Sequence, residues 1–214
     1  LICDGFSGYN KLKGVIRCGC LAHMRRYWKE ALPGKSRKSS DKTHAEIGLD
    51  YCNQLFELEK EYADLDADTR KAERLETEPA IWEAYWSWLE TVNPAGGSRL
   101  AKAVTYAKNQ KPYMENYLLD GRCSISNNIA ENIARPYAVG RKNFLFHDTV
   151  KGAQASAIIY SLVETAKLNN LNIYAYLETV LLYMPDYKNE PEGIEELMPW
   201  SEMIQQRCQI KSKS

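Results

Sequence analysis

The chain has 214 residues, 44% hydrophobic and 26% charged, and its formal net charge is zero. This composition is typical of an ordinary globular protein and excludes collagen, low-complexity and wholly disordered chains. No apolar run approaches the roughly 20 residues that a membrane-spanning helix needs, and no signal peptide is visible. Six cysteines scattered over a chain of this size predict a reduced, cytoplasmic protein that does not depend on disulfides.

The charges are segregated along the chain. Residues 11–43 hold ten lysines and arginines against two acids, and residues 44–92 hold four against thirteen. Residues 93–151 are basic again, with nine against four. A net charge of zero argues against a protein that simply coats nucleic acid, whereas two basic blocks permit a local nucleic-acid surface. The alternative is that each block is only a solvated face.

The first half of the chain predicts two short strands followed by helices. The strands are expected where apolar or β-branched residues are bounded by glycine or a turn, at 1–3 and 14–20. The helices are expected where apolar residues recur every three or four positions, at 21–32, 43–62, 78–92, 98–109 and 111–120. Ser98 is the expected cap of the fourth helix, and residues 35–40 are expected to form a loop. Residues 43–120 therefore form an expected all-helical block, with its aromatic residues in the core.

The second half is also predicted to be helical. Capping residues at 124–128 predict a helix that Pro136 bends or ends. A basic turn is expected at 140–143, and further helices at 152–168 and 173–182. Residues 197–200 are expected to form a docking patch.

Two acids differ from the others in their surroundings. Asp4 follows the first strand and Glu131 lies near the start of a capped helix, among glycine, asparagine and small residues. Carboxylates from different chain segments are suitable ligands for two Mg²⁺ ions in phosphoryl transfer. The alternative for Asp4 is a turn residue, and for Glu131 a first-turn acid that stabilises the helix dipole.

Three cations, Arg135, Arg141 and Lys142, follow Glu131 closely. Arginine binds phosphate bidentately and lysine binds it as a point charge, so this cluster suits a nucleic-acid backbone. The predicted DNA-contacting residues are those three together with Asn128, His23, Arg25 and Arg26.

Several long segments match sequence motifs in the same order along the chain. The segments 4–10 and 19–26 are similar to the motifs D-G-Y-x-G-Y and G-C-x-A-H-x-R-R. The segments 127–136 and 140–146 are similar to N-N-x-A-E-x-x-x-R-P and G-R-K-N-x-L-F, and 197–200 to a closing L-L-P-W. With these motifs the chain resembles bacterial DDE transposases of the insertion-sequence 66 family, whose C-terminal helix residues 159–169 also resemble.

The resemblance implies a mostly α, α+β fold: a fragment of an RNase H-like core with a large helical insertion and C-terminal helices. The implied parts are the start of the core at 1–42, the insertion at 43–120, the Glu helix and basic turn at 121–150, and the C-terminal helices at 151–214. Asp4 resembles the family's second acid and Glu131 its third. The first acid lies upstream in the family, so a partial chain is expected, without the family's N-terminal zinc-binding and DNA-binding regions.

The implied activity is hydrolysis of DNA at transposon ends, followed by strand transfer by the freed 3′-OH. Asp4 and Glu131 are the implied catalytic metal ligands, for two Mg²⁺ or Mn²⁺ ions in the complete site. The implied partners are transposon-end and target DNA, and a homo-oligomer or partner proteins of the same element are left open. The alternative is a non-catalytic helical DNA-binding or assembly module, which does not require Asp4 and Glu131 to meet.

Overall fold

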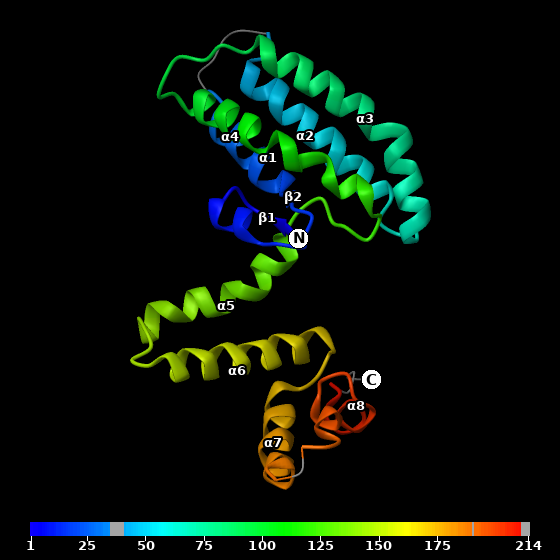
Figure 1. Ribbon diagram of the computed structural model, residues 1–214, viewed down its shortest axis with the longest axis vertical. Coiled ribbons are helices and arrows are strands. Elements are labelled where there is room, and N and C mark those ends of the chain that lie inside the picture. The colour runs from blue at the N-terminus through cyan, green and yellow to red at the C-terminus, as the bar shows by residue number, and fades with distance from the viewer. Residues whose placement is uncertain (35–40, 190, 211–214) are drawn as a thin grey trace. The chain divides into compact units, whose positions relative to one another are not determined.

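The structure is a computed structural model that describes residues 1–34, 41–189 and 191–210. It is mostly helical, as predicted, and divides into two compact units, Leu1–Glu131 and Asn132–Ser214 (Figure 1). The loop expected at 35–40 lies outside the described residues. Within the described part, no helix is both long and apolar enough to span a membrane.

The first unit joins a small parallel strand pair to a bundle of helices. Strand β1 (Ile2–Cys3) pairs with β2 (Cys18–Gly19) in parallel, with Ile2 opposite Cys18. The bundle helices are α1 (Leu21–Glu30), α2 (His44–Glu61), α3 (Ala67–Thr91) and α4 (Arg99–Met114). The 3₁₀ helices η1 (Ser7–Lys11) and η2 (Glu115–Leu119) also belong to this unit. In Figure 1, α1 and α4 lie next to the strands and α3 lies farther away.

The core of this unit is aromatic, as the sequence predicted. Trp28 of α1 and Trp82, Tyr85 and Leu89 of α3 are almost completely buried. The Trp28 indole donates a hydrogen bond to the Tyr85 hydroxyl at 3.2 Å, and the two rings meet edge to face. The burial of these large side chains supplies the main driving force for bundle formation.

Polar caps fix where the bundle helices begin. Thr43 and Glu46 form a reciprocal capping box at the start of α2. The side chain of Ser98 accepts a hydrogen bond from the Ala101 amide, which confirms the predicted cap of α4. At the start of α3, the Asp66 carboxylate accepts hydrogen bonds from two backbone amides. Helix α3 therefore begins about three turns earlier than the expected residue 78.

Prolines at 79, 112 and 136 lie inside helices that continue past them, so the separate helix expected to open at 111 and the turn expected at 140–143 are wrong. Pro79 lies within α3, and α4 continues through Pro112 to Met114, where a separate helix was expected to open. Helix α5 (Asn128–Phe144) runs through Pro136 and includes residues 140–143, which were expected to form a turn. The second strand is also shorter than predicted, because β1 offers only two residues for pairing.

The described part of the second unit contains the rest of α5 and three further α-helices. They are α6 (Val150–Leu168), α7 (Ile173–Tyr183) and α8 (Glu202–Cys208), with 3₁₀ helices η3 (Met184–Tyr187) and η4 (Ile194–Leu197) between the last two. Tyr176 and Ile204 are fully buried between α7 and α8. The Tyr176 hydroxyl donates to the Leu197 carbonyl at 3.2 Å, so Leu197 belongs to this core, whereas Trp200 is 64% exposed.

Candidate carboxylate site and nucleic-acid interface

The candidate site is built on the carboxyl ends of the two parallel strands. Asp4 follows β1 and Cys20 follows β2, and the Cys20 amide donates to the Cys3 carbonyl at 3.0 Å. Strands that run parallel end at the same edge, where parallel sheets commonly bind their ligands. The strand pair therefore brings the segments after β1 and β2 together.

Asp4 is held in a turn at this edge. Its Oδ1 accepts a hydrogen bond from the Phe6 amide at 3.0 Å, which is the turn role considered for this residue. This bond occupies only part of the carboxylate's acceptor capacity, since each carboxylate oxygen has two lone pairs. The turn therefore orients the side chain and leaves acceptor positions for a ligand.

Arg17 is a buried positioning residue that the sequence analysis missed. Its Nη2 donates to the Asp4 carbonyl at 2.9 Å and to Gln110 Oε1 at 2.7 Å. Its Nη1 donates to Asn10, and its guanidinium lies 4.2 Å from the ring centroid of Tyr113. These contacts tie the Asp4 turn to α4. The surrounding sequence gave no signal for this role, because the partners of Arg17 come from distant segments.

Glu131 meets the start of α1. Its Oε1 lies 3.4 Å from Nε2 of His23, which is on the first turn of α1. Two backbone bonds support this junction: the Leu21 amide donates to the Ile125 carbonyl at 3.0 Å, and the Asn127 amide to Cys20 Sγ at 3.5 Å. The motif at 19–26 and the motif at 127–131 are therefore neighbours in the same unit.

Two groups near Asp4 and Glu131, the Cys20 thiol and the Tyr106 hydroxyl, have raised pKa values. Burial raises the pKa of the Cys20 thiol, and the negative charge of Glu131 adds to the increase. Burial also raises the pKa of the Tyr106 hydroxyl, with further contributions from Cys20 and Asp4. Cys20 thus interacts electrostatically with Glu131, and Tyr106 with Asp4. Both carboxylates belong to the region around the end of the strand pair.

The described residues do not by themselves form a complete metal site. No group of three or more histidine, cysteine, aspartate or glutamate side chains in the described ranges is placed to hold a metal ion. Two carboxylates are too few for the pair of Mg²⁺ ions expected in the complete site, since each ion takes several oxygen ligands.

The predicted DNA-contacting residues have different surroundings. Arg26 and Asn128 are exposed, whereas Arg25 is half-buried and donates to Asn53 Oδ1 at 2.7 Å. His23 is only 9% exposed, and its Nδ1 is buried without a partner among the described residues. Burial leaves little of this ring for a phosphate, so its position favours a contact with Glu131 over a contact with DNA.

The remaining predicted DNA contacts lie on α5 in the second unit. Arg135, Arg141 and Lys142 are all exposed. Arg135 and Lys142 are seven residues apart, so they share one face of the helix. Helix α5 is joined to α6 by an aromatic contact between Tyr137 and Tyr160, whose ring centroids are 5.1 Å apart. The cations therefore project from an anchored helix.

Comparison with known proteins gives three relatives from Sinorhizobium fredii (strain NBRC 101917 / NGR234). Uncharacterized protein y4qI is 30% identical over 92% of this chain and 38% of its own length. Uncharacterized protein y4hP is 29% identical over 85% of this chain and 34% of its own length, and uncharacterized protein y4jD is 28% identical over 92% and 40%. This chain thus spans two-fifths or less of the length of these relatives. No solved structure matches it.

Two family models match the chain in succession. The model described as "IS66 C-terminal element" matches residues 161–200. The model described as "Transposase IS66 family" matches residues 1–155, a range that contains Asp4, Glu131 and the cations of α5. The chain therefore belongs to the IS66 transposase family.

Proposed function

We propose that this chain is the DNA-binding and carboxylate-bearing part of a DNA transposase that cleaves transposon ends and joins them to target DNA. The observation that carries the proposal is the contact between His23 and Glu131, which joins two family motifs at the end of the strand pair. A purely helical DNA-binding or assembly module does not need this junction. Asp4 at the same edge adds a second carboxylate.

In this proposal, the strand pair and α5 are parts of an RNase H-like core, and residues 43–120 are its helical insertion. Asp4 and Glu131 are metal ligands that require a further ligand beyond the described groups. When bound, Mg²⁺ supplies charge stabilisation for phosphoryl transfer. The chain's own residues hold these carboxylates in place: Arg17 fixes the Asp4 turn and His23 contacts Glu131.

The first test measures phosphate binding by α5. We expect Arg141→Ala to weaken binding of the 214-residue chain to 30-base-pair DNA duplexes equally for unrelated sequences. The slope of log affinity against log salt should fall by about 0.9 for the lost phosphate contact. Fluorescence anisotropy between low and moderate salt measures both quantities.

Lys167→Ala is the matched control for that experiment. Lys167 lies in the same unit, but its ammonium is 2.6 Å from Glu164 and is already neutralised. We expect its removal to leave the salt slope unchanged. An unchanged slope for Arg141→Ala would remove that residue from the DNA surface, and a wild-type chain that binds no DNA would overturn the proposed DNA-binding function.

The second test addresses Glu131 in a cleavage-competent transposase that contains this segment. We expect Glu131→Gln to lower end cleavage by at least about a hundredfold, because even residues that only orient a metal ligand cost 10–100-fold when lost. DNA affinity should change little, since an anionic carboxylate does not bind DNA phosphates directly. Gel assays of cleavage and binding on the same DNA give both values.

Glu61→Gln, at an exposed position of α2, is the control and should leave cleavage unchanged. Cleavage that survives Glu131→Gln would exclude Glu131 from the catalytic site.

A further inference from the structure

A groove between α1 and α4 has features of a nucleic-acid site that the family motifs do not include. It has a volume of about 410 Å³ and is lined by aromatic, polar and cationic side chains, among them Tyr27, Lys102, Thr105, Tyr106 and Asn109. All of these residues belong to the first unit. The groove is therefore defined within one compact part of the chain.

Two stacked tyrosines form one wall of the groove and connect it to the carboxylate site. The ring centroids of Tyr27 and Tyr106 are 4.4 Å apart, with 25° between the ring planes. A side-chain carbon built on Gly5 would lie 2.9 Å from a ring carbon of Tyr106, so this ring packs against the turn that holds Asp4. The groove thus adjoins the Asp4 turn.

The charge of the two helices favours a polyanionic ligand. Helix α4 carries four lysines or arginines and no acid, and α1 carries three against one acid. By contrast, α2 and α3 together carry eleven acids against four cations. Lys108 of α4 is paired with Glu90, whereas Lys102 is exposed and has no ion pair among the described residues. Lys102 is therefore available to a phosphate at the groove.

We propose that the α1–α4 groove binds a single strand of DNA beside the carboxylate site. A base stacks on the Tyr27 ring, Lys102 contacts a phosphate, and the exposed side chains of Thr105 and Asn109 offer hydrogen bonds. An aromatic ring stacks only on a base whose face is open, so the ligand is an unpaired strand rather than a closed duplex. This inference rests on the proposed function, since it specifies how DNA approaches Asp4.

The test compares binding of a labelled 20-nucleotide single strand and the corresponding duplex to the 214-residue chain. We expect Tyr27→Leu to lower single-strand affinity roughly five- to tenfold and to leave the salt slope unchanged, because it removes stacking only. We expect Lys102→Gln to lower affinity severalfold and to reduce the slope by about 0.7, as for one lost phosphate contact on a single strand. Duplex affinity should change less in both variants.

Lys60→Gln is the matched control, because Lys60 is an exposed lysine on acidic α2 and should not affect binding. Circular dichroism checks that Tyr27→Leu is folded, and Lys102→Gln, at an exposed position, gives an independent answer if it is not. If the wild-type chain binds DNA but both variants bind the single strand normally, the groove assignment is overturned while the proposed function stands. Equal losses for duplex and single strand would overturn the single-strand assignment. A wild-type chain that binds neither DNA would overturn the proposed function itself.

Discussion

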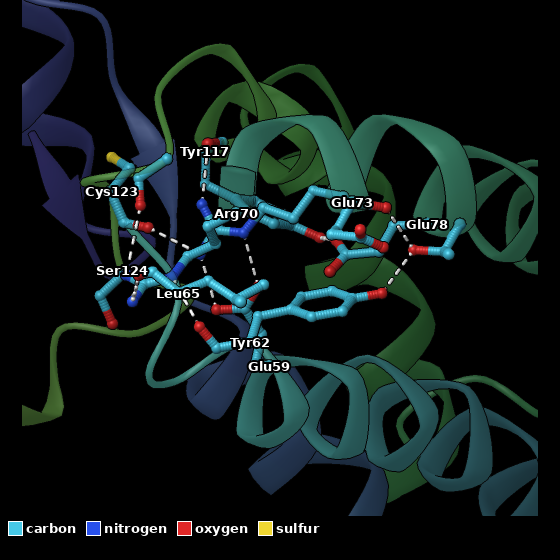
Figure 2. A network of polar contacts seen from close by, with 12 residues as sticks. Glu59, Tyr62, Leu65, Arg70, Glu73, Glu78, Tyr117, Cys123 and Ser124 are labelled. Atoms are coloured by element: carbon cyan, nitrogen blue, oxygen red, sulfur yellow. Dashed lines mark hydrogen bonds and ion pairs between the residues drawn. The ribbon is translucent and has the colours of Figure 1, made fainter. Parts of the chain in front are cut away.

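Arg74→Met is expected to destabilise the first unit by about 3–5 kcal/mol, because it leaves the largely buried carboxylate of Glu59 without its partner. Arg74 is fully buried in α3, and its Nε and Nη2 each lie 2.6 Å from an oxygen of Glu59 in α2. Nη2 also donates to the Cys123 carbonyl at 2.9 Å. Figure 2 shows the polar network of this region, with Glu59 and Cys123 labelled. Arg74 therefore joins α2, α3 and the segment that leads to Glu131.

Arg122→Met is the matched control for this prediction. The ion pair of Arg122 with Asp120 has the same 2.6 Å separation but is exposed to solvent, so its loss should change the free energy of unfolding little. Urea denaturation followed by tryptophan fluorescence reports mainly on the first unit, which contains four of the five tryptophans. The double variant Glu59→Gln/Arg74→Met should recover part of the loss, since it leaves no unpaired charge. A loss for Arg74→Met as small as that for Arg122→Met would contradict the assigned burial cost.

The sequence predicted the parts of this fold that depend on local patterns. The Ser98 cap and the helices α1, α2, α6 and α7 are close to their expected places, because capping and amphipathicity are encoded within a few residues. The expected start of α3 at residue 78 and the separate helix expected from 111 were wrong, because contacts from elsewhere in the fold outweigh the local cost of proline. In α3, the Asp66 cap and the buried side chain of Arg74 hold the turns before Pro79.

The candidate site was only partly predictable for the same reason. Asp4 and Glu131 were identified by their unusual neighbours and by the family motifs. Arg17 and Tyr106 were not predicted, because their roles depend on contacts between distant segments. Arg17 donates a hydrogen bond to Gln110, and Tyr106 packs against the turn at Gly5. No spacing within the sequence predicts such contacts. The helical block at residues 43–120 thus contributes to the surroundings of Asp4, because it contains α4.

Glu78 should make the stability of the first unit depend on pH. Burial raises the pKa of its carboxyl from the ordinary 4.5 to about 7, and the nearby Glu59 carboxylate adds to the increase. Arg74 and the Tyr117 hydroxyl, which donates to Glu78 Oε2, oppose the increase without cancelling it. Between pH 4.5 and about 7 the folded state therefore holds a proton that the unfolded state releases. The contribution of Glu78 to stability is present below pH 4.5 and is lost as pH rises through 7.

Glu78→Gln should remove this loss, because glutamine resembles the protonated carboxyl and does not titrate. Relative to wild type, the variant should gain stability between pH 4.5 and 8, by at most about 3 kcal/mol. Urea midpoints at these two pH values measure the difference. The control is Glu76→Gln, an exposed acid on the same helix, whose effect should be nearly independent of pH. If wild type and Glu78→Gln show parallel pH profiles, Glu78 is ionised in the folded protein, and the buried cluster carries one more negative charge than it does with Glu78 protonated. The Arg74 guanidinium would then have to balance the carboxylates of both Glu59 and Glu78. Arg74→Met removes the positive charge of this buried cluster and Glu78→Gln removes an acid, so the two variants test the same cluster.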